Sequence, residues 1–145
     1  MIRKLGDIIY NHLLVAVEES EYSLRAAQEV LNLVDDHTEV SLIHVIDPNR
    51  MEEDILPSVI NEIKYNQFEE KYKEIKEFYQ TNQIHHTLEV KEGNIADLIL
   101  EEANSGKYDA IVIGAMGKKK FLKLEFGHVS DKILKESSIP VILVK

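Results

Sequence analysis

The 145-residue chain contains no cysteine, which excludes disulfide bridges, thiolate metal sites and cysteine nucleophiles and permits a reducing compartment. No stretch approaches the roughly 20 apolar residues that a membrane-spanning helix needs. Residues 1–10 also lack the uninterrupted apolar run of a signal peptide. We therefore expect a cytoplasmic protein that does not associate with membranes.

Positive charge is scarce as well. The chain has 17 Lys and Arg against 26 Asp and Glu, a formal net charge of −9. A negative net charge disfavours electrostatic binding of nucleic acid, so we expect no nucleic-acid partner. Any anion site should be local. The length fits one compact domain over residues 1–145, with residues 1–11 as an N-terminal extension.

Continuous apolar runs alternate with helical patterns along the chain. Such runs are typical of strands buried on both faces, and five strands are expected, at residues 13–17, 40–46, 84–90, 110–113 and 141–144. Capping residues, prolines and apolar spacing predict four helices between them, which begin after Ser20, at Pro57, after Asn94 and shortly before Val129.

This alternation predicts an α/β fold, a doubly wound five-stranded parallel sheet with helices on both faces. The third strand alternates between apolar and polar residues, which is typical of a sheet edge, so the natural strand order is 3-2-1-4-5. Ligands of such sheets bind outside the carboxyl ends of the strands, at the point where the order reverses. Here that point lies between the first and fourth strands and comprises residues 17–20 and 114–130.

The fourth expected strand leads into a loop marked by three glycines and then into a helix. A strand, a glycine loop and a helix together offer backbone N–H groups to a phosphate, although glycines in a loop also serve simply as turn residues. Two residues separate Gly114 from Gly117, so the loop is not a P-loop, which needs four. The lysines of this loop either attract a polyphosphate or form a solvated basic surface, and they are Lys118, Lys119, Lys120 and Lys123.

Four segments in this order resemble the universal stress protein family, and the resemblance covers residues 13–144. They are Leu14–Ser20 with Ser23–Ala27 after it, His44–Asp47, Tyr108–Gly114 and Ser138–Val144. The resemblance implies an adenine nucleotide alpha hydrolase-like fold with strand order 3-2-1-4-5. It also implies a homodimer, which we expect to form through the apolar C-terminal strand.

One branch of the family binds ATP through glycine, two residues, glycine, nine residues, glycine, and then serine or threonine. Gly114, Gly117 and Gly127 stand at this spacing, but His128 occupies the hydroxyl position. Glu18 replaces the family's aspartate, which contacts the adenosine half, and Val40 is the expected apolar contact for adenine. The resemblance thus implies a site for ATP, with or without Mg²⁺, formed by Ala16, Val17, Glu18, Val40, Ile113, Gly114, Met116, Gly117, Gly127, His128, Val129 and Ser130.

Three functions remain open at this stage. The first is a dimeric stress-response protein that binds ATP or a related adenine nucleotide as a sensor or regulatory ligand. The second is a dimeric interaction module that has lost the nucleotide, which His128 and Glu19 favour because they replace the family's usual residues. The third is a slow ATPase or phosphotransfer enzyme, for which the sequence supplies no general base. A metal site at His85 and His86 is disfavoured because adjacent strand residues point to opposite faces.

Overall fold

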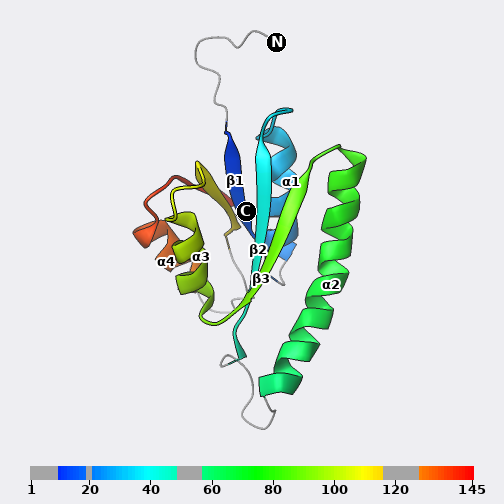
Figure 1. Cartoon of the computed structure of the whole chain (residues 1–145), viewed down its shortest axis with the longest axis vertical. Helices are drawn as coiled ribbons and strands as arrows, with labels where there is room; N and C mark the ends of the chain where they lie inside the picture. The colour runs from blue at the N-terminus through cyan, green and yellow to red at the C-terminus, as the bar shows by residue number, and fades with distance from the viewer. Residues whose placement is uncertain (1–9, 19–20, 49–56, 116–127) are drawn as a thin grey trace.

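The computed structural model describes residues 10–18, 21–48, 57–115 and 128–145. Within these ranges it contains five strands, four α-helices and one short 3₁₀ helix (Figure 1). None of the described helices is both long and apolar enough to span a bilayer. In chain order the elements are β1 (His12–Ala16), α1 (Glu21–Glu29), η1 (Val30–Asn32), β2 (Glu39–Ile46), α2 (Pro57–Thr81), β3 (His86–Glu92), α3 (Ile95–Ala103), β4 (Ala110–Gly114), α4 (His128–Glu136) and β5 (Val141–Val144).

The five strands form one parallel sheet in the order β3-β2-β1-β4-β5, which confirms the expected topology. The central strand is β1, in which Leu13 is opposite Val40 of β2 on one side and Ala110 of β4 on the other. No residue of β3 is fully buried, as expected of an edge strand with one solvated face. The order reverses between β1 and β4, and this junction positions the candidate site.

Helices cover the sheet on both faces, with α1 and α2 on one side and α3 and α4 on the other (Figure 1). Alternate residues of each central strand belong to two separate cores. Leu13 and Val15 of β1 pack in the core under α1 and α2, whereas Leu14 and Ala16 pack in the core under α3 and α4. Burial on both faces explains why these strands are uninterrupted apolar runs in the sequence.

The boundaries of α2 and β3 show where the apolar pattern was misleading. The sequence pattern predicts that the third strand begins at Ile84, but β3 begins at His86. Gln83 has a φ of 58° and the N–H of Ile84 donates to the carbonyl oxygen of Tyr79, so residues 82–85 form the turn that ends α2. Ile84 is apolar because its side chain closes the core at this turn, where it is 8% exposed.

Part of the sheet is open on the side of α3 and α4. The core on that side draws residues from β1, β2, β4 and β5, and in the part of the chain that the structure describes it includes none from β3. Thr87 and Glu89 of β3 are exposed on this open half. A groove therefore runs along β2 and β3, beside the last turn of α3 and the amino end of β1.

Candidate functional site

The site begins where β1 and β2 end. The N–H of Val17 donates to the carbonyl oxygen of Ile43 at 2.9 Å, which extends the pairing of the two strands by one residue. The carbonyl oxygen of Val17 accepts a hydrogen bond from Nδ1 of His44 at 2.6 Å. His44 is 4% exposed, so its imidazole is buried in the core. Both main-chain groups of Val17 are thus held by β2, so the first turn of the site is fixed.

Glu18 follows directly and is half-buried. Its N–H donates to Oγ of Ser23 at 2.7 Å, and Ser23 is itself buried in α1. This bond ties the end of β1 to the first turns of α1. Glu18 therefore lies at the junction predicted to hold the ligand, at the carboxyl edge of the sheet.

Gly114 ends β4 beside this turn, and close packing requires a glycine there. A Cβ atom on Gly114 would lie 2.7 Å from the carbonyl carbon of Tyr22 in α1, a distance that side chains do not tolerate. Because the obstacle is backbone, no side-chain rearrangement would relieve it. Gly114 thus allows α1 to approach the end of β4, a structural role that the sequence pattern did not reveal.

The first turn of α4 is fastened to the same strand end. Ser130 is 2% exposed, and its Oγ donates to the carbonyl oxygen of Gly114 at 3.2 Å. The first N–H groups of a helix have no partners within the helix, and they carry a partial positive charge. The main chain of His128, Val129 and Ser130 therefore presents donors at the edge where β4 ends. The hydroxyl proton of Ser130 is already used, so any anion would meet its backbone N–H.

The structure brings most of the described candidates together, at the carboxyl ends of β1 and β4 and the start of α4. Three candidates lie outside the described residues, namely Met116, Gly117 and Gly127, as do the four lysines of the glycine loop. The candidates that the structure does place at this edge are Ala16, Val17, Glu18, Ile113, Gly114, Val129, Ser130 and the main chain of His128.

The structure does not bring Val40 to this edge. Val40 lies at the amino end of β2, opposite Leu13, and is buried in the core under α1 and α2. A strand rises about 3.3 Å per residue, so Val40 is roughly 16 Å from Val45 along the strand. Val45 is the apolar residue of β2 near the carboxyl edge, on the face that packs under α3 and α4. The rule that ligands bind at strand carboxyl ends, applied to the second strand, would have selected Val45.

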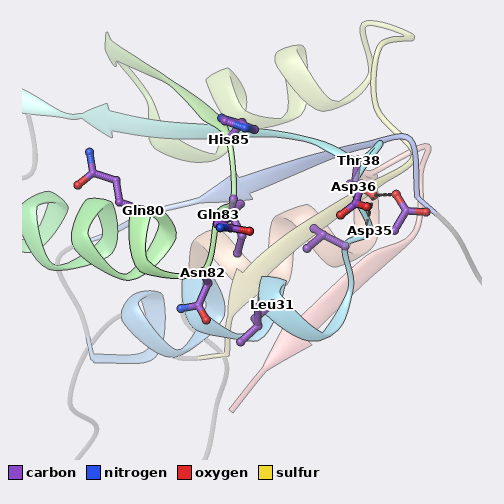
Figure 2. Close-up of a pocket in the computed structure, with 10 residues that line it drawn as sticks. Leu31, Asp35, Asp36, Thr38, Gln80, Asn82, Gln83 and His85 are labelled. Atoms are coloured by element: carbon purple, nitrogen blue, oxygen red, sulfur yellow. Dashed lines mark hydrogen bonds between the residues drawn. The ribbon is translucent and has the colours of Figure 1, made fainter.

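The side chains of the adjacent residues His85 and His86 lie in different surroundings, as expected. His86 accepts or donates a hydrogen bond with the Tyr72 hydroxyl at 2.8 Å, and its pKa is lowered by burial. His85 instead lines a cavity of about 750 Å³ with Gln83 and Leu31 (Figure 2). This cavity lies at the amino ends of β2 and β3, opposite the candidate site. Across the described ranges, no three His, Cys, Asp or Glu side chains gather as metal ligands would.

Comparison with known proteins agrees with this geometry. The profile of the Universal stress protein family matches residues 9–145. Universal stress protein MJ0531 of Methanocaldococcus jannaschii is 28% identical over 146 residues, which cover 97% of this chain and 85% of that protein. The solved structure of hypothetical protein MJ0577 has a TM-score of 0.78 and 26% identity, and the match covers 95% and 97% of the two chains. UspA from Lactobacillus plantarum has a TM-score of 0.79 and 19% identity, covering 96% and 100%.

Proposed function

Because the chain belongs to the universal stress protein family, we propose that it binds ATP or a related adenine nucleotide as a sensor or regulatory ligand. The observation that carries this proposal is the bond between Ser130 and Gly114. It holds the N-terminal turn of α4 against the end of β4, at the point where the strand order reverses. A helix N-terminus at this place in a doubly wound sheet suits a phosphate.

In the proposed complex the phosphates lie over the N-terminal turn of α4. Gly117 and Gly127 leave the main chain free to approach them, and Mg²⁺ accompanies ATP as a counterion. Because the chain carries a net charge of −9, the attraction for the phosphates must come from local groups, namely the helix N-terminus and the lysines 118–120. His128 stands where the family has a hydroxyl residue, but it still contributes a backbone N–H.

The nucleoside half is proposed to lie toward β1 and β2. The Glu18 carboxylate would accept hydrogen bonds from the ribose hydroxyls, and Val45 replaces Val40 as the apolar contact for the base. Two solved relatives support an adenine nucleotide as the ligand. A universal stress protein in complex with cAMP has a TM-score of 0.71 and 18% identity, and a family protein from Arabidopsis thaliana with AMP bound has a TM-score of 0.65 and 17% identity.

The experiment is direct. Purified protein is quenched with acid, any released nucleotide is identified by chromatography, and ATP, AMP and cAMP are titrated calorimetrically. We expect one equivalent of an adenine nucleotide, and a loss of affinity greater than about tenfold in Gly127→Val, whose side chain would hold the phosphate away from the backbone. Gly106→Ala is the control, because Gly106 lies in the turn after α3; nothing lies within 4 Å of an added Cβ there, and its φ of 92° makes the change only mildly unfavourable. Unchanged affinity in Gly127→Val would contradict the proposal.

Absence of both bound nucleotide and measurable affinity would favour the second function, an interaction module without a ligand. ATP turnover that disappears in a Gly117 variant would favour an enzyme instead. The described residues around the nucleotide site include no nucleophile paired with a base, which is why we rank ATP hydrolysis or phosphotransfer last. The cytoplasmic location stays a prediction from the sequence.

We further propose a homodimer through β5. Its carbonyl oxygens at Pro140 and Val144 accept from Ile111 and Ala115 on the side of β4. In a parallel ladder alternate residues face the same neighbour, so Val141 and Leu143 turn their N–H and C=O groups outward. Such an edge is a template for pairing with a second copy of the same strand.

A further inference from the structure

The open groove beside α3 contains a serine and a histidine in hydrogen-bond contact. Oγ of Ser41, on β2, lies 2.7 Å from Nε2 of His12, on β1. The other ring nitrogen of His12, Nδ1, lies 3.7 Å from Oε2 of Glu39. A hydroxyl, an imidazole and a carboxylate in this sequence of contacts are the parts of an activated nucleophile.

The sheet register produces this arrangement. Parallel pairing places His12 opposite Glu39 and Leu14 opposite Ser41, so the serine and the carboxylate flank the imidazole on one face. His12 is well fixed, because Asp109 accepts from its N–H at 3.1 Å and donates its own N–H to the His12 carbonyl oxygen at 2.9 Å. The imidazole also contacts the Tyr108 ring at a centroid distance of 4.4 Å.

In one of the two His12 tautomers the serine is the donor to His12. Thr87 of β3 donates its hydroxyl proton to Oγ of Ser41 at 3.2 Å. The Ser41 hydroxyl also forms a hydrogen bond with the Tyr108 hydroxyl. When the Ser41 proton is directed at Nε2 of His12 instead, Nδ1 carries the proton that faces Glu39. In this tautomer His12 is a base for Ser41.

The contacts open onto a cavity of about 460 Å³, a volume suited to a small ligand. Leu14 and Ile43 form part of an apolar wall, and Lys107 lines the same cavity with its side chain 64% exposed. The Lys107 ammonium lies 3.7 Å from Oε2 of Glu102, which lines the same cavity. The groove thus combines a hydroxyl, an imidazole beside it and an apolar wall.

We propose that Ser41 is a nucleophile that accepts acyl groups from small carboxylic esters. Oγ of Ser41 attacks the carbonyl carbon, and its proton passes to Nε2 of His12. The bond between that carbon and the leaving alcohol oxygen breaks, and the alcohol takes the proton from His12. A water molecule then attacks the acyl-Ser41 ester by the same route and releases the acid. Ser41 and His12 are the catalytic residues, and Glu39 is a positioning residue.

The first test is acylation of the purified full chain by p-nitrophenyl acetate. We expect an acetyl group on Ser41 in tandem mass spectra, no label there in Ser41→Ala, and nitrophenolate release slowed by at least about tenfold in His12→Gln. Ser138→Ala is the matched control, because that exposed serine contacts Asn104 and no histidine. Acetyl groups on lysines alone, or full reactivity in Ser41→Ala, would overturn the proposal.

A second test measures activation without turnover. The chain has no cysteine, so Ser41→Cys introduces a single thiol. An imidazole partner lowers a thiol pKa from about 8.5, so alkylation by iodoacetamide should reach half its maximum at a lower pH than in Ser138→Cys. The difference should vanish when His12→Gln is added. Equal pH profiles in folded Ser41→Cys and Ser138→Cys, with folding checked by circular dichroism, would show that His12 does not activate position 41.

Discussion

The imidazole of His44 joins the first turn of the candidate site to helix α2. Its Nδ1 donates to the Val17 carbonyl oxygen at 2.6 Å, while its ring stacks on that of Phe68 at a centroid distance of 3.9 Å and an interplanar angle of 6°. Phe68 is 1% exposed in the core under α1 and α2. The position of the Val17 main chain is therefore coupled to the packing of a helix that contributes no candidate residue.

We expect Phe68→Leu to reduce nucleotide affinity several-fold, because the shifted imidazole would release the Val17 carbonyl. The free energy of unfolding should fall by roughly 1 to 2 kcal/mol. Ile75→Val is the control, since Ile75 is buried in the same core and costs about 1 kcal/mol by loss of one methyl group. Calorimetric titration measures the change in nucleotide affinity of both variants, and urea denaturation measures their change in stability. Equal affinity losses in the two variants would argue against coupling through His44.

Gly114→Ala tests the close approach of α1 to β4. The added Cβ would lie 2.7 Å from the Tyr22 backbone, so we expect a loss of stability of about 1 to 3 kcal/mol, and more if the helix cannot shift. Gly106→Ala meets no atom within 4 Å, but its φ of 92° is unfavourable for alanine, and this change should cost only about 1 kcal/mol. Urea denaturation measures both values. A Gly114 variant as stable as the native chain would show that α1 moves freely.

Tyr108→Phe tests a buried carboxylate. The Tyr108 hydroxyl donates to Oε2 of Glu102 at 2.5 Å and is the main reason that the pKa of Glu102 is lowered. The side chain of Glu102 is 10% exposed and also meets Lys91 and Lys107. A lowered pKa in the folded state stabilises the protein above the unfolded pKa of about 4.3, and this contribution is lost as the pH falls through the folded value.

The variant should therefore lose roughly 1.5 to 3 kcal/mol at pH 7, because a hydrogen bond to a charged group is removed. The difference from the native chain should shrink as the pH falls from about 5 to 3. Tyr65→Phe serves as the control, since Tyr65 is 43% exposed. Urea denaturation at several pH values measures the effect, and a loss independent of pH would point to packing rather than to the carboxylate.

Leu143→Pro tests the dimer edge. Leu143 turns its N–H away from β4, so proline there removes an outward donor and leaves the bonds between β4 and β5 in place. The Leu143 side chain packs in the core under α3 and α4, so some stability is also lost. Leu143→Ala loses that packing but keeps the N–H. In light scattering we expect a dimer for the native chain and Leu143→Ala, and a folded monomer for Leu143→Pro; a native monomer at tens of micromolar would contradict the proposed interface.

Much of the fold could be predicted because the sequence pattern records burial. The apolar runs of β1 and β4 and the alternation in β3 were enough to place the centre and one edge of the sheet. The structure places Val40 at the amino end of β2, away from the other candidates, because an apolar residue in a strand identifies a buried face and does not tell which end of the strand is near a ligand. The proximity of Ser41 and His12 could not be predicted, since they lie 29 positions apart in the sequence and only the register of β1 and β2 brings them together.

The central place of β1 also bears on synthesis of the chain. One neighbour, β2, emerges from the ribosome soon after β1, but the other, β4, emerges only after α1, β2, α2, β3 and α3. At about 5 to 20 residues per second, β1 waits on the order of 5 to 20 seconds with one side unpaired. An unpaired apolar strand is prone to aggregate. The nascent chain should therefore need chaperone protection until β4 has emerged.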